Sequence, residues 1–288
     1  MTPVPEPASA RDRILENYSS ERGFHIFTAA ELAGIYRALG IDPKSAHRLI
    51  FETEGLSHHG QAEMLRLFEA AGISSAHLVL DAGCGNGGPT RLLAKTKACR
   101  IQAFDLNPVQ IARAEECDRL EGVEALIELS VQDVHRLAYP DEMFDRVIHN
   151  ETSCHWELKG AAFRELFRVL KPGGVRAFHD WARGDAGGLD DAGGDFPGTY
   201  APGIWFQTTP AETTRLLREA GFEVLLDEDT TEAVDVGMRA RLKELELSSA
   251  CLAWFPEEYY RRSLRYFRTM IATHYTYLRY RRFLVKRQ

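Results

Sequence analysis

Leu78-Val-Leu-Asp-Ala-Gly-Cys-Gly-Asn-Gly-Gly88 is the stretch that decides the fold of this 288-residue chain. Three apolar residues lead into an acidic residue and then into a turn with four glycines, and Pro89 follows, a residue suited to the first turn of a helix. Glycine adopts positive φ without steric cost and lets the backbone approach a bound molecule closely. The stretch therefore predicts a strand, a nucleotide-binding turn and a helix that continues through Thr90 to Ala94.

Two cofactor classes fit this turn. Gly83, Gly85 and Gly88 have the spacing of the dinucleotide fingerprint, in which a helix N-terminus receives a pyrophosphate. Asp81, Gly83, Gly85 and Gly87 also form an acidic-x-Gly-x-Gly-x-Gly pattern. Asp81 favours the class of cofactor that fits this second pattern, because a carboxylate supports a cofactor that carries an ammonium and a sulfonium. The same carboxylate would be poorly placed beside the pyrophosphate of a dinucleotide. A tight turn without any ligand is the third interpretation.

Further strands follow the glycine turn along the chain. The second ends in Asp105, about 20 residues past the glycines, where a carboxylate accepts hydrogen bonds from a ribose diol. Gln132-Asp133-Val134 follows the third, and the turn Leu170-Lys-Pro-Gly-Gly174 precedes the fifth. The predicted strands after the first cover residues 100–106, 125–131, 144–151, 175–180, 222–226 and 277–286.

In this order and spacing, the motifs resemble those of the class I S-adenosylmethionine (SAM) methyltransferases over roughly residues 75–235. The resemblance implies an α/β fold with a seven-stranded Rossmann-like sheet, mostly parallel with an antiparallel last strand. It implies SAM as the cofactor, with Asp133 against the adenine amino group. The residues implied in cofactor binding are Asp81, Gly83, Cys84, Gly85, Asp105, Leu106, Gln132, Asp133, Val134 and Asn150.

The segments outside this region indicate a cap and a lid. Residues 1–75 are expected to form an N-terminal helical cap, with helices near 10–18, 29–39 and 60–71, ahead of a core at 76–288. An insertion at 184–208 is rich in Gly, Asp and aromatic residues, and loops longer than about 12–15 residues in a compact domain are more often lids than connectors. Thr209, Pro210 and Glu212 then form a capping box that starts the next helix.

Charge is distributed unevenly. Residues 259–288 carry nine Arg or Lys and no Asp or Glu, so the net charge of −7 comes from an acidic body. Tyr260, Leu264, Phe267 and Ile271 would share one face of a helix within 257–288, ahead of the last strand. We expect this helix to dock on the domain with a solvated basic face; binding an anionic substrate or an acidic neighbouring subunit of a homo-oligomer is the alternative. The acidic balance and the pI of about 5.8 exclude a nucleic-acid partner.

Other compositional features exclude several classes. The five cysteines show no paired spacing, which indicates reduced thiols and a cytoplasmic protein. No stretch approaches the ~18 apolar residues of a membrane span, and the N-terminus has no signal-peptide pattern. The ten histidines include no metal-ligand spacing, so no metal site is predicted.

The end of the fourth strand is the expected place for chemistry, because ligands of open parallel sheets bind at the carboxyl ends of the strands. Asn150-Glu151-Thr152-Ser153 there resembles the terpenoid and sterol carbon-methyltransferases, including those that act on geranyl diphosphate. The resemblance implies that Glu151 faces the methyl acceptor. Methylation of an alkene leaves a carbocation, which Glu151 and aromatic faces would stabilise, and Glu151 or His155 would accept the proton. The aromatic residues expected to line the acceptor pocket are Trp156, Trp181, Tyr200, Trp205 and Phe206.

The sequence thus predicts a SAM-dependent methyltransferase of a small metabolite, with carbon methylation of an apolar prenyl or terpenoid acceptor as the leading hypothesis. N- or O-methylation of an amine or natural product is the alternative, and an NAD-dependent oxidoreductase or a non-catalytic SAM-binding protein is the more distant one. Glu151 also has a purely structural interpretation, as a carboxylate that binds backbone N–H groups at the next helix start. A diphosphate acceptor would require converging basic side chains, from the basic C-terminal segment or from Arg22 and Arg37.

Overall fold

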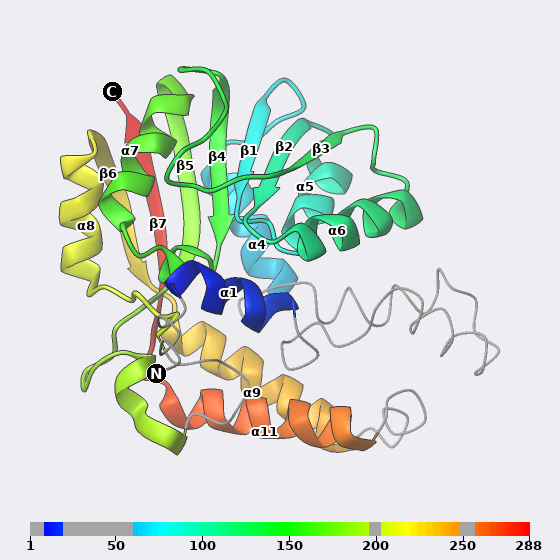
Figure 1. The fold of residues 1–288 in the computed structure, drawn as a ribbon, viewed down its shortest axis with the longest axis vertical. Helices are drawn as coiled ribbons and strands as arrows, with labels where there is room; N and C mark the ends of the chain where they lie inside the picture. The colour runs from blue at the N-terminus through cyan, green and yellow to red at the C-terminus, as the bar shows by residue number, and fades with distance from the viewer. Residues whose placement is uncertain (1–8, 20–59, 196–202, 248–256) are drawn as a thin grey trace, which may run out of the picture.

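The computed structural model describes residues 9–19, 60–195, 203–247 and 257–288 (Figure 1). Its centre is a seven-stranded sheet with the order β3-β2-β1-β4-β5-β7-β6. β7 pairs antiparallel with both β5 and β6 and the remaining pairs are parallel, which confirms the predicted sheet. The strands are β1 (Leu78–Ala82), β2 (Arg100–Asp105), β3 (Ile127–Val131), β4 (Phe144–Asn150), β5 (Leu170–Ala182), β6 (Phe222–Asp229) and β7 (Arg279–Arg287).

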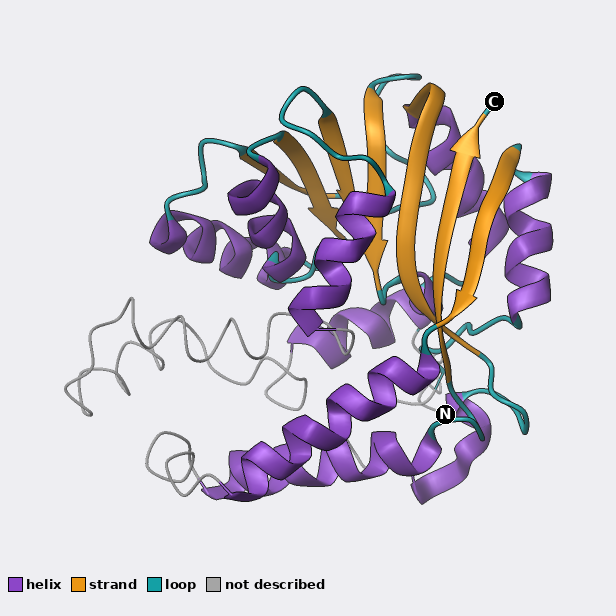
Figure 2. Ribbon diagram, turned by 180° about the vertical axis from the view of Figure 1, so that it is seen from behind, coloured by secondary structure: helices purple, strands orange, loops and turns teal. Residues whose placement is uncertain are grey.

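Helices cover both faces of the sheet (Figures 1 and 2). On one face lie α4 (Gly60–Ala70), α5 (Gly88–Lys97) and α6 (Pro108–Glu121); on the other lie α7 (Lys159–Val169) and α8 (Pro210–Glu219). Each face has its own apolar cluster, and every large side chain buried there contributes about 2 kcal/mol to stability. One cluster includes Met64, Phe68, Val79, Leu93, Ile111 and Ile148, and the other includes Leu80, Val147, Phe163, Leu166, Phe178 and Leu217.

The helix starts follow the local signals in the sequence. Gly87 caps α5 with a φ of 81°, ahead of Pro89. Asn107 caps α6, because its side chain accepts a hydrogen bond from the backbone N–H of Val109 at 2.9 Å. The predicted capping box is present at α8, where Thr209 and Glu212 exchange hydrogen bonds. α4 packs directly on the sheet through the cluster that contains Val79.

Three further helices lie beyond the carboxyl ends of the parallel strands (Figure 1). They are α1 (Ala10–Ser19), α9 (Thr231–Leu247) and α11 (Glu257–Thr273), and the last two lie side by side. α9 begins five residues before the predicted Val236, because Thr231 enters the helix with its backbone N–H bonded to Asp229 at 2.9 Å. In α11, Phe267 and Ile271 are partly buried whereas Arg265 and Arg268 are exposed, as predicted for a docked helix.

The four arginines of β7 pair with carboxylates of the chain itself. Arg279 contacts Asp185 at 2.7 Å, and Arg287 contacts Glu142 at 2.7 Å. Arg281 and Arg282 of β7 pair with carboxylates of β6 and α4, namely Asp227, Asp229, Glu228 and Glu63. These arginines therefore fasten the antiparallel strand to its neighbours.

The described parts of the 184–208 insertion pack against the sheet and the outer helices. A short 3-10 helix, η2 (Leu189–Asp195), is anchored by the backbone N–H of Leu189, which donates to the Gln207 side chain at 2.7 Å. Trp205 is buried in a third apolar cluster. This third cluster joins Trp181, Leu189, Ile204, Trp205, Val234, Met238, Met270, Leu278 and Tyr280.

Tyr200 and the helix predicted at 29–39 lie outside the described residues.

Candidate active site

The glycine turn lies at the point where the strand order reverses, between β1 and β4. Gly83 and Gly85 have φ values of 76° and 55°, in the left-handed region that glycine favours. A Cβ atom on Gly85 would meet nothing within 4 Å, whereas a Cβ on Gly83 would lie 2.3 Å from the Thr152 hydroxyl oxygen. The turn thus presents an open backbone surface at Gly85 and touches the loop after β4 at Gly83.

Two carboxylates end the strands beside this turn. Asp81 is buried and accepts a hydrogen bond from the Thr90 hydroxyl at 2.6 Å. Burial raises the pKa of Asp81 to about 7. The hydrogen bond from Thr90 opposes this rise, and the negative charge of Asp105 adds a smaller increase. Asp105 accepts from the backbone N–H groups of Gly85 and Asn107, both at 2.9 Å, and burial raises its pKa as well. Both predicted carboxylates therefore flank the glycine turn.

The other predicted cofactor residues near β2 and β3 are placed in different ways. The Asp133 carboxylate accepts hydrogen bonds from the backbone N–H and the ring of His135, and it lies 3.7 Å from the Arg11 guanidinium of α1. Burial alone would raise the pKa of Asp133, but these contacts outweigh it and lower the pKa. The Gln132 side-chain amide forms hydrogen bonds close by in the chain: it donates to the Ser130 hydroxyl and accepts from the backbone N–H of Ala138. Val134 is buried in the core cluster and Leu106 is half-buried. Cys84 is also buried, with its thiol directed to the Gly85 carbonyl at 3.6 Å.

The end of β4 shows two unusual features. The side-chain oxygen of Asn150 is buried and has no hydrogen-bond partner among the described residues. Glu151 has a φ of 52°, a left-handed conformation that is strained for a residue with a side chain, and its N–H donates to the His179 carbonyl at 2.9 Å. Such strain persists only where the surrounding structure imposes it, and it clusters at functional sites.

His155 is held by both ring nitrogens. Nδ1 lies 2.9 Å from the Ile204 carbonyl oxygen, which can only accept, so Nδ1 carries the proton and Nε2 accepts from the Tyr18 hydroxyl at 2.7 Å. Burial lowers the pKa of His155 to about 4, so the ring is neutral at pH 7. His155 thereby ties α1 to the insertion. The sequence did not predict the contact between Tyr18 and His155, because no local pattern marks the pairing of two residues 137 positions apart.

The predicted aromatic residues separate into two groups. Trp181 stacks on Trp205 with ring centroids 5.0 Å apart, and Trp205 also lies 4.6 Å from the His155 ring. Trp156 instead packs in the core cluster against Phe163 and is almost fully buried. Phe206 is half-buried, and its backbone N–H donates to the Cys154 carbonyl at 2.6 Å.

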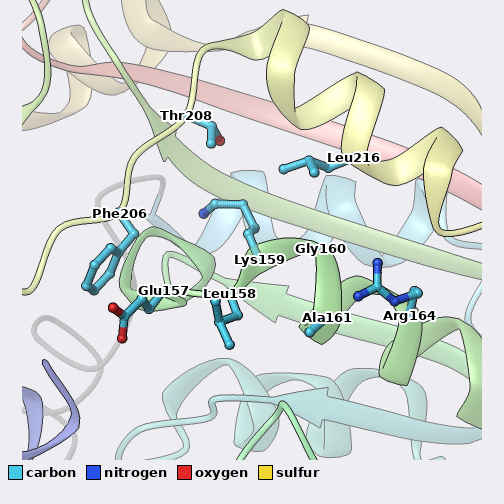
Figure 3. Close-up of a pocket in the computed structure, with 9 residues that line it drawn as sticks. All are labelled: Glu157, Leu158, Lys159, Gly160, Ala161, Arg164, Phe206, Thr208 and Leu216. Atoms are coloured by element: carbon cyan, nitrogen blue, oxygen red, sulfur yellow. The ribbon is translucent and has the colours of Figure 1, made fainter. Parts of the chain in front are cut away.

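A cavity of about 410 Å³ opens between the start of α7, the segment 206–208 and α8 (Figure 3). Phe206 is the one predicted site residue in its wall, and no residue of the glycine turn lines it. The cavity is therefore separate from the turn. Its wall consists of Glu157, Leu158, Lys159, Gly160, Ala161, Arg164, Phe206, Thr208 and Leu216.

The described parts of the chain carry neither a metal cluster nor a membrane-spanning helix. No group of three or more His, Cys, Asp or Glu residues there could hold a metal ion. None of the helices described has the length and apolarity needed to cross a membrane. Cys84, Cys99, Cys117 and Cys154 are buried free thiols.

Comparison with known proteins agrees with this arrangement. Residues 80–178 match a family model described as a methyltransferase domain. The sterol 24-C-methyltransferase of Eremothecium gossypii is 32% identical over 174 residues, which cover 59% of this chain and 46% of that protein. The chain thus spans about half the length of this curated relative.

Two solved structures show the same fold at low sequence identity. Haemonchus contortus phosphoethanolamine N-methyltransferase 2 has a TM-score of 0.75 and 19% identity, covering 99% of this chain and 61% of that one. Geranyl diphosphate C-methyltransferase from Streptomyces coelicolor A3(2) has a TM-score of 0.66 and 15% identity, covering 99% and 100%. Together with the sheet order, these likenesses show that the chain has the fold of the two solved methyltransferases and that its residues 80–178 are similar to the methyltransferase-domain family.

Proposed function

We propose that this protein is a SAM-dependent methyltransferase that methylates a carbon atom of an apolar prenyl, terpenoid or sterol-like acceptor. The observation that carries the proposal is the position of Glu151: it stands in a strained conformation at the end of β4, next to Thr152, which touches the glycine turn at Gly83. The relative from Eremothecium gossypii, by its name, methylates carbon, as does the Streptomyces coelicolor enzyme.

The residues around the turn fit SAM as the cofactor. Gly85 offers backbone with free space beside it, and Asp105 lies at the strand end where a ribose diol is bound in this fold. Asn150 adds a buried amide oxygen that accepts no hydrogen bond from any described part of the chain. Asp81 would face the positively charged portion of the cofactor.

Bound SAM supplies a methyl group already activated by its sulfonium, so the protein's task is alignment and charge stabilisation. Glu151 would stabilise positive charge that develops on the acceptor, and would afterwards accept its proton. The paired rings of Trp181 and Trp205, which are buried beside His155, would exclude water from the acceptor. Because the β7 arginines are paired with carboxylates of this chain, these four arginines do not favour a diphosphate acceptor.

N- or O-methylation is the second candidate, and the state of His155 favours it. Its ring is neutral, with Nε2 as the hydrogen-bond acceptor, which is the form that a general base requires. Tyr18 occupies that nitrogen in the structure, so proton transfer from a substrate would have to pass through or displace the Tyr18 hydroxyl.

The acceptor class is tested by incubating the protein with methyl-labelled SAM and a panel of prenyl alcohols, prenylated indoles, sterols, prenyl diphosphates, amines and phenols. We expect NMR of the product to place the label on carbon, and excess S-adenosylhomocysteine to suppress its formation. Products labelled only on nitrogen or oxygen would select the second candidate. Calorimetric binding of NAD without binding of S-adenosylhomocysteine would end both.

Cofactor affinity should depend on pH through Asp81. The pKa of this carboxyl is about 7 without ligand, and a cofactor ammonium would lower it, so binding at lower pH must release a proton. Affinity for S-adenosylhomocysteine is therefore expected to rise with pH, by up to about tenfold per unit, and to level off near pH 7. Calorimetry in buffers of different ionisation enthalpy measures both effects. Asp81→Asn should abolish the slope and the proton release; a slope that persists in this variant would assign it to another group.

A further inference from the structure

One peptide group in the loop after β4 is held at both ends by buried side chains. The backbone N–H of Cys154 donates to the Asp180 carboxylate at 3.2 Å. The carbonyl of Ser153, on the other side of the same peptide bond, accepts a hydrogen bond from the Lys159 ammonium. The Ser153 hydroxyl also donates to Asp180, so three hydrogen bonds fix a single turn of chain.

The two charged side chains come from regular elements on either side of the loop. Asp180 lies near the end of β5, where the Trp181 N–H also donates to it at 2.7 Å, and Lys159 is the first residue of α7. Asp180 is 5% exposed and Lys159 is 6% exposed. Loops in proteins rarely bury an acid and a base beneath them, because removing both charges from water costs several kcal/mol per ion unless geometry compensates.

The clamped peptide lies between the two residues with predicted chemical roles. Glu151 precedes it by two positions in its left-handed conformation, and the Cys154 thiol contacts the Glu151 carbonyl at 3.6 Å. His155 follows it directly. A shift of this peptide would therefore move both side chains together, and would also displace Thr152 from the glycine turn.

We infer that Asp180 and Lys159 are positioning residues, which hold the Ser153–Cys154 peptide so that Glu151 keeps its strained conformation and faces the acceptor. The claim that Glu151 faces the acceptor rests on the proposed function, whereas the claim that the two side chains hold the peptide rests on geometry alone. The two charges depend on each other. Burial raises the pKa of Asp180 to about 6, and the positive charge of Lys159 limits this rise. Burial lowers the pKa of Lys159, and the negative charge of Asp180 limits that decrease.

The test compares Asp180→Asn with a matched control, Asp227→Asn, which removes a carboxylate of the edge strand β6 that binds Arg281 at 2.9 Å. Amide hydrogen exchange of residues 151–156 reports the clamp without any need for activity. An amide oxygen accepts more weakly than a carboxylate, so we expect faster exchange at Cys154 in Asp180→Asn and unchanged exchange there in Asp227→Asn. We expect kcat to fall about tenfold, with KM for SAM and the Kd of S-adenosylhomocysteine within about twofold of wild type.

Asp180→Asn leaves Lys159 buried without its carboxylate, so the double variant Asp180→Asn/Lys159→Met guards against loss of folding. This variant removes the Lys159 charge together with the carboxylate beside it, leaves Arg176 as the buried cation that Asp180 also stabilises, and should lose the same factor in kcat. Wild-type exchange at Cys154 in both Asp180 variants would overturn the clamp. Faster exchange with control-like kcat would overturn the positioning role. If the wild-type protein transfers no methyl group to any acceptor, the proposed function fails, while hydrogen exchange still decides whether the clamp exists.

Discussion

Replacing Glu151 with glutamine is expected to slow methyl transfer by about two orders of magnitude and to leave cofactor affinity nearly unchanged. The variant keeps the shape of the side chain and removes its charge. A carboxylate that stabilises a carbocation acts mainly in the transition state, so its loss should appear in kcat rather than in KM for SAM. Single-turnover rates with a carbon acceptor, together with calorimetry of S-adenosylhomocysteine, measure the two quantities separately.

Glu157→Gln is the matched control, because this carboxylate lies six positions further along the same segment and is exposed. It should turn over at the wild-type rate. Near-normal turnover in Glu151→Gln would instead assign Glu151 the structural role, in which its carboxylate binds backbone N–H groups. A loss of cofactor affinity as large as the loss of kcat would show that the substitution disturbs the glycine turn through Thr152.

The sheet was predictable because its signals are local. An apolar run ending in an acidic residue marked β1 and β2, and glycines and prolines marked the turns, so the number and direction of the strands followed from the resemblance that these motifs carry. The capping box at Thr209 located the start of α8 to the residue. These features depend on neighbours within about four positions, which a sequence displays directly.

The contacts that complete the site were not predictable, because they join distant segments. Tyr18 meets His155 across 137 positions, and Asp180 meets Ser153 across 27. Trp156 and Trp205 both looked like pocket aromatics, but Trp156 belongs to the core on the α7 face whereas Trp205 stacks on Trp181. An isolated tryptophan carries no sign in the sequence of the direction in which it will pack.

Gly83→Ala is expected to weaken binding of S-adenosylhomocysteine by about 100-fold, equivalent to about 3 kcal/mol. The new Cβ would stand 2.3 Å from the Thr152 hydroxyl oxygen, on a backbone with a φ of 76°. The left-handed conformation alone costs an alanine about 1–2 kcal/mol, and relief of the contact must move either the glycine turn or the loop that carries Glu151. Gly85→Ala is the comparison: it has a similar φ of 55° and no described protein atom within 4 Å of its Cβ, so its loss reports the backbone cost and contact with the cofactor without the Thr152 contact. Thr152→Gly should restore part of the affinity to Gly83→Ala, because it removes every atom that the added methyl group would strike. Equal losses in the Gly83 and Gly85 variants, with no rescue by Thr152→Gly, would mean that the two loops are not in the contact described, and that turn and acceptor loop are positioned independently.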